Sequence, residues 1–377
     1  MIESILVNTY NADPGLRRAA EAALHDILRQ HGSLSAFVNF IGDMNNHRDL
    51  RLAAAIAIKN KAREYWRDDK LTPDSFVISE DEKEYVRSAI IQVLLQEKDS
   101  AIRGLIAEVI KAYAEFDYPE KWPTLLPLLV TSISSQSNIL HVYNALLAIR
   151  KLVKKYEYKN KDQRGPLDDI IHATFPQLIV IAASTFQSSN YSYESAQIMR
   201  MILKIFWSAI MFTLPLTSQG LDIQAWFQLL GHVVDLDVAI EENDDDAKAH
   251  HPWWKCKKWA SRIMCQFIQR YGNPRHVGDE YKTFATYFKN NVANVFLAPI
   301  MNTLHKKSQG VYVSDTVHRM CLSYTATAIE MSPSYKAIKP HLDFLLFKVI
   351  FPTLCMTSQV SKMLIGGIMT EYLLYRT

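Results

Sequence analysis

Apolar residues recur at intervals of three and four along nearly the whole chain, which places them on one face of a helix. The alternation that is typical of β-strands is almost absent. One clear stripe consists of Ile102, Leu105, Ile106, Val109, Ile110 and Tyr113. Gly and Pro number only 12 and 14 among 377 residues, which disfavours turn-rich β folds. The pattern therefore predicts an all-α protein.

Residues that favour helix starts stand just before many of these stripes. Proline is favourable in a first helical turn, where its missing N–H costs no hydrogen bond, and it follows Asp13, Gly165 and Ser332. Ser79 and Glu82 have the spacing of a capping box. We also predict Ser33 and Asp99 as N-caps.

In sequence order, the predicted helices form pairs that begin near residues 14, 48, 99, 138, 192, 251 and 310. Intervals of roughly 35 to 60 residues are typical of HEAT-like repeats with insertions. A single pair cannot bury its apolar face, so successive pairs must stack on one another. We expect an α-solenoid of about seven HEAT-like helix pairs in a right-handed superhelical arch.

One connection between the predicted helices is strongly acidic. Residues 235–246 contain seven carboxylates and no apolar stripe, which favours a solvated, mobile loop. These carboxylates belong to Asp235, Asp237, Glu241, Glu242, Asp244, Asp245 and Asp246. Such a cluster attracts basic proteins in a salt-dependent way, although a loop that only improves solubility is the alternative.

Composition and motifs argue against several classes of protein. The longest apolar runs are much shorter than the roughly 20 residues of a membrane span, and the first ten residues lack the basic start of a secretory signal. We therefore expect an intracellular protein with no membrane partner. Four cysteines fit neither a disulfide framework nor a paired zinc site, so we predict free thiols, mostly buried.

Nothing in the sequence indicates catalysis. Phosphate-binding loops, nucleophile elbows and zinc-protease motifs are absent, so we predict no catalytic residue, no cofactor and no enzyme activity. His250, His251 and Cys256 are the one cluster with the chemistry of metal ligands, but their spacing fits no zinc pattern. We therefore predict no metal site.

Two other clusters have competing interpretations. Trp253, Trp254 and Trp259 could stack on bases, but their helical surroundings favour core packing beside lysine side chains. A basic run could bind phosphates, or it could simply stabilise a helix C-terminus, and we do not favour nucleic-acid binding. This run consists of Arg150, Lys151, Lys154, Lys155, Lys159, Lys161 and Arg164.

Several stretches resemble the importin-β (karyopherin-β) family of nuclear transport receptors. The sequence RLAAAIAIKNK at 51–61, followed by Tyr65 and Trp66, resembles the second-repeat signature of the family's N-terminal domain. The sequence RAAEAAL at 18–24 resembles its first repeat, and YPEKWPTLLPLL at 118–129 its third. The acidic loop followed by PWWKCKKWA at 252–260 is similar to the subgroup of importins seven and eight.

The resemblance extends from about residue 2 to 356 and implies an N-terminal portion of such a receptor. It divides the chain into an N-terminal domain at 1–134, further HEAT-like repeats at 135–356 and an atypical tail at 357–377. In the family, the second helix of each N-terminal repeat faces the GTPase Ran in its GTP form. By position, the candidate residues for Ran are Glu80, Asp81, Glu82, Glu84 and Lys121. Carboxylates in a first helical turn also favour the helix dipole without any partner.

The resemblance further implies a receptor that shuttles between cytoplasm and nucleus. FG-repeat nucleoporins would bind apolar grooves between adjacent outer helices. Basic cargo such as ribosomal proteins or histones would bind the concave face, where the acidic loop 235–246 could also contact Ran or cargo. We expect a monomer. A HEAT-repeat scaffold or regulatory subunit without a transport role is the alternative.

Overall fold

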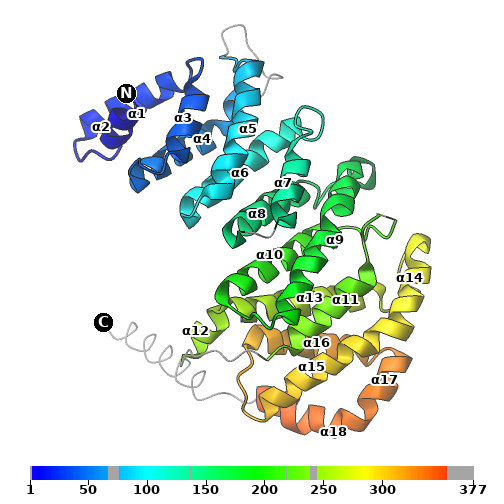
Figure 1. The fold of residues 1–377 in the computed structure, drawn as a ribbon. Helices are drawn as coiled ribbons and strands as arrows, with labels where there is room; N and C mark the ends of the chain where they lie inside the picture. The colour runs from blue at the N-terminus through cyan, green and yellow to red at the C-terminus, as the bar shows by residue number, and fades with distance from the viewer. Residues whose placement is uncertain (1, 67–75, 136–137, 218, 238–243, 355–377) are drawn as a thin grey trace, which may run out of the picture. The chain divides into compact units, whose positions relative to one another are not determined.

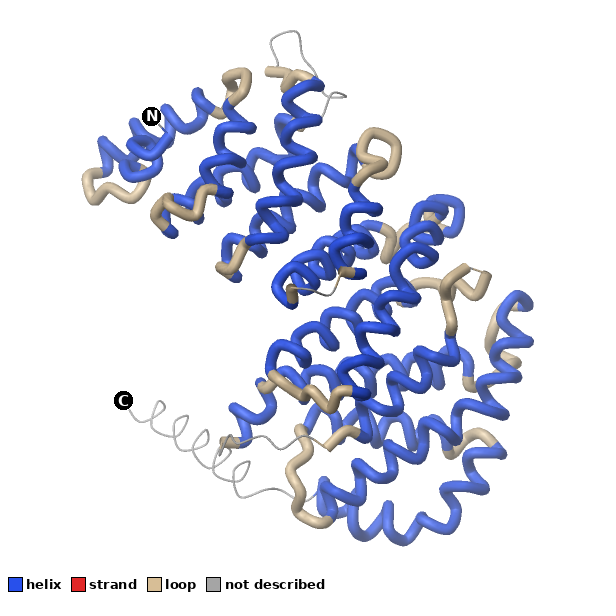
Figure 2. Tube along the Cα trace, in the orientation of Figure 1, coloured by secondary structure: helices blue, strands red, loops and turns tan. Residues whose placement is uncertain are grey.

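The computed structural model of the chain describes residues 2–66, 76–135, 138–217, 219–237 and 244–354. Every regular element in these ranges is helical (Figure 2). The predicted all-α fold of HEAT-like helix pairs is thus confirmed. The chain divides into two compact units, residues 1–223 and residues 224–377.

The first unit is a stack of paired helices (Figure 1). Its helices are α1 Ile2–Asn8, α2 Pro14–Ile27, α3 Ser33–Gly42, α4 Arg48–Tyr65, α5 Glu80–Gln96, α6 Ser100–Asp117, α7 Leu125–Ser134, α8 Ile139–Lys155, α9 Gly165–Gln187 and α10 Tyr193–Ile210, with a 3-10 turn at Lys161–Gln163. The helices form two rows. In one row, α4 packs on α6, α6 packs on α8 and α8 packs on α10. In the other row, α3 packs on α5, and α7 packs on α9. Neighbouring repeats therefore bury each other's apolar faces.

The second unit contains helices of very different lengths, some of them joined directly by 3-10 or π turns. Its elements are α11 Ile223–Asp235, α12 Asp245–His250, α13 Pro252–Tyr271, α14 Lys282–Tyr287, α15 Ala293–Ser308, α16 Asp315–Ala328, α17 Ser332–Ile338, α18 Leu342–Phe344 and α19 Phe351–Leu354, joined by 3-10 turns at Asp279–Tyr281 and Lys339–His341 and by π-turns at Phe288–Val292 and Leu345–Ile350. Helix α13 packs on α16, and α16 packs on α15. Between them lies an aromatic core made by Phe227, Phe267, Phe284, Phe288, Phe296 and Tyr324.

Predicted helix starts agree closely with the structure. The first helix of the seven predicted pairs begins at Pro14, Arg48, Ser100, Ile139, Tyr193, Pro252 and Asp315. The Asp13 carboxylate accepts bonds from the N–H groups of Gly15 and Leu16, and the Ser79 hydroxyl accepts one from the Glu82 N–H. Asp99 likewise caps α6. Local side-chain chemistry thus marks these helix ends.

The predicted N-cap at Ser33 is wrong. Helix α3 begins at Ser33 itself, and the residue in the cap position is Gly32, whose φ of 79° is in the left-handed region. Glycine adopts this conformation without steric cost. The N–H groups at this helix start are satisfied instead by a carboxylate from another helix, as described below.

Helix α9 is the described helix that is long and apolar enough to cross a membrane, with a mean hydropathy of 1.3 over its most apolar window. Residues such as Ile170, Phe175 and Leu178 are fully buried, and the helix packs against α7 and α10. The apolar residues of α9 therefore pack in the core of the first unit.

Three of the four cysteines lie in the described part of the chain. Cys256, Cys265 and Cys321 are free and buried, as predicted. Cys355 and the predicted tail at 357–377 lie outside the described residues.

Candidate protein-binding sites

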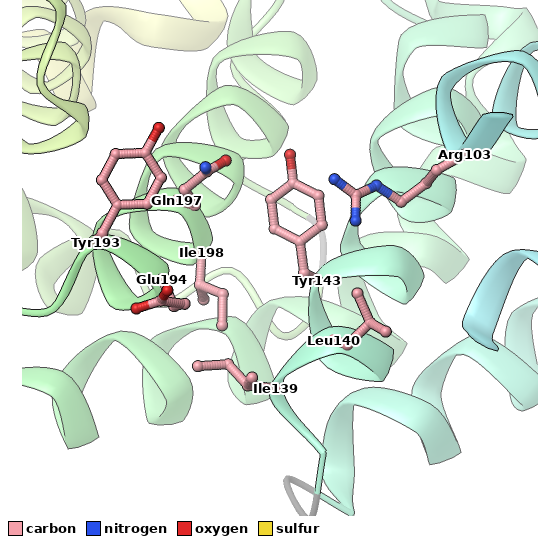
Figure 3. Close-up of a pocket in the computed structure, with 8 residues that line it drawn as sticks. All are labelled: Arg103, Ile139, Leu140, Tyr143, Tyr193, Glu194, Gln197 and Ile198. Carbon is pink, nitrogen blue, oxygen red and sulfur yellow. The ribbon is translucent and has the colours of Figure 1, made fainter. Parts of the chain in front are cut away.

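A groove opens between the N-terminal ends of α8 and α10 in the first unit (Figure 3). Both helix starts are fixed by side-chain caps. The Asn138 amide oxygen accepts bonds from the N–H groups of Leu140 and His141, at 2.9 and 3.3 Å. The Ser192 hydroxyl accepts a bond from the Ser195 N–H at 3.2 Å. These caps hold the two ends that form the walls of the groove.

The groove encloses about 210 Å³. Its lining consists of Arg103, Ile139, Leu140, Tyr143, Tyr193, Glu194, Gln197 and Ile198. Ile139 and Tyr193 are 47% and 54% exposed, whereas Ile198 is buried. The guanidinium carbon of Arg103 lies 4.7 Å from the centroid of the Tyr143 ring, a cation–π distance. An apolar floor with a polar rim suits one inserted apolar or aromatic side chain.

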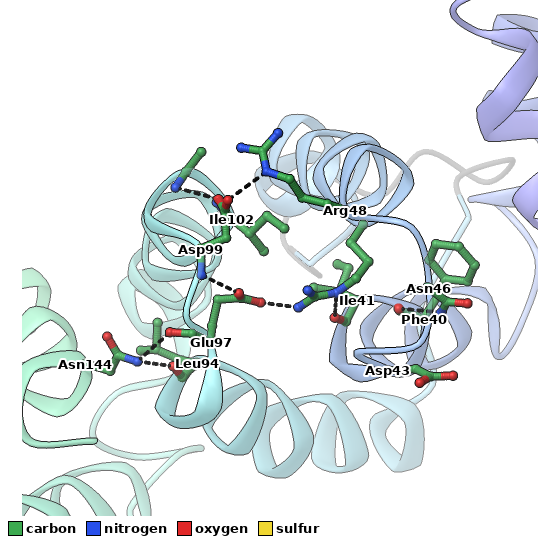
Figure 4. A network of polar contacts seen from close by, with 12 residues as sticks. Phe40, Ile41, Asp43, Asn46, Arg48, Leu94, Glu97, Asp99, Ile102 and Asn144 are labelled. Atoms are coloured by element: carbon green, nitrogen blue, oxygen red, sulfur yellow. Dashed lines mark hydrogen bonds and ion pairs between the residues drawn. The ribbon is translucent and has the colours of Figure 1, made fainter. Parts of the chain in front are cut away.

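A buried polar network supports the helices of this region (Figure 4). The Asn144 side-chain amide on α8 donates to the carbonyls of Leu94, Leu95 and Glu97 at the C-terminal end of α5, at 2.8, 3.1 and 3.0 Å. Carbonyls at a helix C-terminus lack the N–H partners of a following turn, so Asn144 helps to satisfy them and joins α8 to the preceding repeat.

The same network continues to α4. The buried Glu97 carboxylate pairs with Arg51, whose Nε donates to the Ile41 carbonyl at 2.7 Å. Arg48 pairs with Asp99 at 2.8 Å. Bonds from the Ile102 N–H and from Arg48 lower the pKa of the Asp99 carboxyl. The turn between α5 and α6 is therefore fixed to both neighbouring repeats.

The predicted Ran-binding carboxylates lie near the N-terminal end of α5, and the structure divides them into one buried side chain, Glu82, and three exposed ones. Glu82 is only 7% exposed, and it accepts bonds from the N–H groups of Gly32, Leu34 and Ser35 at 2.8, 3.0 and 3.2 Å. Its carboxylate thus caps α3. Glu80 is exposed and pairs with Arg87 at 2.7 Å.

Asp81 and Glu84 are exposed on α5, and Lys121 is exposed in the turn between α6 and α7. Their predicted role in binding Ran stays a prediction. The structural role of Glu82 was missed because its partners lie about 50 residues earlier in the sequence.

Another buried carboxylate, Asp117, was also missed. It accepts bonds from the Trp66 indole N–H and from Arg87, both at 2.8 Å. The Trp66 ring stacks on Tyr113 with centroids 3.6 Å apart. Burial opposes the charge of Arg87, but its bonds to Asp117 and Glu80 prevail and raise its pKa. No local spacing in the sequence indicates this cluster.

Five of the seven predicted carboxylates in the acidic loop lie in described positions, and Glu241 and Glu242 lie outside them. Asp235 accepts a bond from the Asn302 amide, and Asp237 pairs with Lys306 at 2.7 Å. Asp244 caps α12 through the Ala247 N–H at 3.0 Å. Helix α15 and the start of α12 therefore anchor the two ends of the loop.

Apart from Asp244, which caps α12, the described part of the acidic loop carries exposed carboxylates. Asp237 and Asp245 have side chains that are 79% and 77% exposed, and Asp246 is exposed as well. These carboxylates can contact basic groups of another molecule.

Three residues of the basic run make internal contacts, whereas Lys154 and Lys159 are exposed. Lys155 donates to the carbonyls of Ala114 and Tyr118 at the end of α6, at 3.0 and 2.8 Å. Lys151 pairs with Glu108, and the buried Arg164 donates to Thr213 at 2.9 Å. Burial lowers the pKa of Lys155. These contacts favour the structural interpretation over a phosphate-binding surface.

The tryptophan cluster also has a structural role. Trp253 is 1% exposed, and Trp254 packs edge-on against Tyr312 with centroids 5.2 Å apart. No group of three potential metal ligands occurs among the described residues, so His250, His251 and Cys256 do not form such a group.

Comparisons with known proteins show a domain match and sequence similarity to importins. Residues 20–96 match the family model described as the importin-beta N-terminal domain. The importin beta-like SAD2 homolog of Arabidopsis thaliana is 30% identical over 92% of this chain and 33% of its own length. Importin-8 of Homo sapiens is 29% identical over 91% of this chain and 33% of its own length. The chain thus spans about one third of the length of these relatives.

The solved structure of the exportin Cse1 in its cargo-free, cytoplasmic state superposes with a TM-score of 0.75 over 99% of this chain and 39% of that chain. At 16% identity this likeness shows a shared fold. The sequence matches together show that residues 20–96 form an importin-beta N-terminal domain and that the chain is similar to importins over most of its length.

Proposed function

We propose that this chain acts in nuclear transport, shuttling between cytoplasm and nucleus and binding Ran in its GTP form, FG-repeat nucleoporins and basic cargo. The observation that carries the proposal is the groove between α8 and α10, in a chain that is similar to importins over most of its length. Stacked repeats flex through small changes at each interface, so ligands that prefer different curvatures oppose each other's binding.

The groove suits the phenyl ring of a Phe-Gly repeat. Ile139 and Tyr193 supply exposed apolar surface, while Gln197 and Glu194 supply polar groups at the rim. One such contact is weak, but several contacts to a repetitive chain add through effective concentration. Weak, repeated binding allows passage through a pore without arrest.

Retention on immobilised FG repeats tests this site. Ile139→Ser removes exposed apolar surface from the groove and should weaken binding about two- to tenfold. Val180→Ser is the matched control, because Val180 is 51% exposed on α9 and does not line the groove. Equal retention of both variants and the unmodified chain would remove this groove from the proposal.

We propose that Ran contacts the exposed residues of the predicted surface, among them Asp81 and Glu84. Pull-down of Ran loaded with GTP should exceed that of Ran loaded with GDP. Charge reversal at Asp81 and Glu84 should weaken the GTP-dependent part, since both residues are exposed on α5. A stable partner bound without any nucleotide dependence would instead indicate a scaffold without a transport role.

Basic cargo is proposed to bind the acidic loop. Asp245 and Asp246 are exposed, so Asp245→Asn with Asp246→Asn should weaken binding of a histone or ribosomal protein. The loss should be larger at low salt, because salt screens exposed charges. A loss that is independent of salt would contradict an electrostatic role of the loop.

A further inference from the structure

A cavity of about 270 Å³ lies in the second unit at the base of the acidic loop. It is formed by residues 236–237 just after α11, by α12, by the first turns of α13, by the last turns of α15 and by residues 311–313 after α15. Trp254 and Tyr312 form an aromatic wall, and Lys248, Lys257 and Lys306 also line the space. Asp237 is the one carboxylate among the described lining residues. The described lining therefore carries three ammonium groups against one carboxylate.

Each of these lysines is held near the cavity by a specific contact. Lys257 is 8% exposed, and its Nζ donates to the Val234 carbonyl at the C-terminal end of α11, at 2.6 Å. Lys306 donates to both oxygens of Asp237 at 2.8 and 2.7 Å. Lys248 lies 5.2 Å from the centroid of the Tyr312 ring and pairs with Asp245 at 3.4 Å. The cavity thus holds preformed cationic groups.

Lys257 is the most constrained of the three. Among the described residues no carboxylate forms an ion pair with it, and the bond that it donates goes to a neutral carbonyl. Burial and then the nearby Lys306 lower its pKa to about 8, although Asp237 and Asp235 act in the opposite direction. An anion in the cavity would compensate this buried charge.

We propose that this cavity binds a phosphorylated side chain within a basic peptide segment. The phosphate would lie between Lys257 and Lys306 and would replace Asp237 as the partner of Lys306. The volume is several times the roughly 30 Å³ of a water molecule, so a phosphate group fits. The exposed carboxylates of Asp245 and Asp246 favour basic residues on either side of the phosphate. This site goes beyond the proposed transport function, which needs no phosphorylated ligand.

Fluorescence anisotropy with two versions of one labelled Lys/Arg-rich peptide tests the proposal. One version contains a single phosphoserine and the other contains serine. The phosphoserine version should bind the full chain at least about fivefold more tightly, as expected for charge-assisted hydrogen bonds. Equal affinity of the two peptides would overturn the proposal, whatever the affinity of the serine version for the acidic loop.

Three variants assign the preference to this cavity. Lys306→Met should abolish the phosphoserine preference, whereas Asp237→Asn should increase it, because the internal competitor loses its charge. Lys258→Met is the matched control, since Lys258 is exposed on the same helix as Lys257, and it should leave the preference unchanged.

The signs of these effects keep the proposal falsifiable. A smaller preference in Asp237→Asn, or equal losses in Lys306→Met and Lys258→Met, would overturn it. Lys257→Met leaves the Val234 carbonyl without its donor and could disturb the fold. Its result is therefore read together with that of Lys306→Met, because the Lys306 side chain lies at the more exposed edge of the cavity.

Discussion

Glu82 is a side chain that acts on a helix other than its own. Its two oxygens accept three N–H groups at the start of α3, where backbone donors have no partner within the helix, and the Leu34 donor is buried. In Glu82→Gln the side-chain NH₂ would face one of these donors. We expect this variant to lose about 1 to 3 kcal/mol of unfolding free energy, measured by denaturant unfolding. Glu84→Gln, on the exposed face of α5, should change it by less than about 0.5 kcal/mol.

Lys257 should make stability depend on pH. Its pKa is about 8 in the folded chain and near 10.5 when exposed, so between these values the unfolded chain binds more protons. The contribution of this group to the free energy of unfolding therefore rises from pH 8 to 10.5, by at most about 3 kcal/mol. Unfolding curves of the unmodified chain and of Lys257→Met should diverge over this range. Parallel curves would contradict the assigned burial of the ammonium group.

The buried thiols should be unreactive at neutral pH. Burial raises the pKa of both Cys265 and Cys321 to about 12, so almost no thiolate is present below pH 9. Ellman's reagent at pH 8 should modify these two residues only slowly in the folded chain, and rapidly in urea. Mass spectrometry of the modified peptides identifies each site. Rapid labelling of the folded chain at either residue would contradict the burial.

At the scale of helices, sequence reasoning succeeded where the cause is local. The caps Asp13, Ser79 and Asp99 bond to N–H groups two or three residues ahead, so spacing alone identifies them. The contacts of Glu82 and Asn144 join residues about 50 positions apart. Such contacts depend on how repeats stack, and no periodicity within one helix encodes them.

The buried Arg51–Glu97 pair connects α4 to the turn after α5. Arg51→Met should destabilise the chain by about 3 to 5 kcal/mol, because Glu97 would remain buried with an uncompensated charge. The double variant Arg51→Met, Glu97→Gln should recover part of this loss. Denaturant unfolding of the four members of this mutant cycle measures the coupling. Simple additivity of the two single losses would contradict a direct interaction.

At the scale of the molecule, each helix pair in the first unit contacts mainly its neighbours in the stack. In repeat proteins this pattern makes stability a sum of repeat and interface contributions. A fragment of residues 1–222, which ends before α11, should therefore remain helical and unfold cooperatively. Circular dichroism during heating checks this expectation. A fragment that lacks helical structure at 20 °C would show that the first unit depends on the second.

The fold was predictable because helical periodicity and repeat spacing are properties of the sequence itself. The binding surfaces were harder to predict from the sequence than the fold. Ile139 and Tyr193 follow the same apolar pattern as core residues, and only the stacking of α8 and α10 leaves them exposed. The cavity around Lys257 likewise combines five stretches of the chain, at 236–237, 248, 253–257, 303–306 and 311–313.

The cap that Glu82 provides for α3 affects how mutational scans of this acidic turn are interpreted. Charge reversal at Glu82 would disrupt the start of α3, and a pull-down would register misfolded protein as lost affinity. Asp81 and Glu84 are free of this ambiguity because both are exposed. A scan restricted to these two positions would separate recognition from folding.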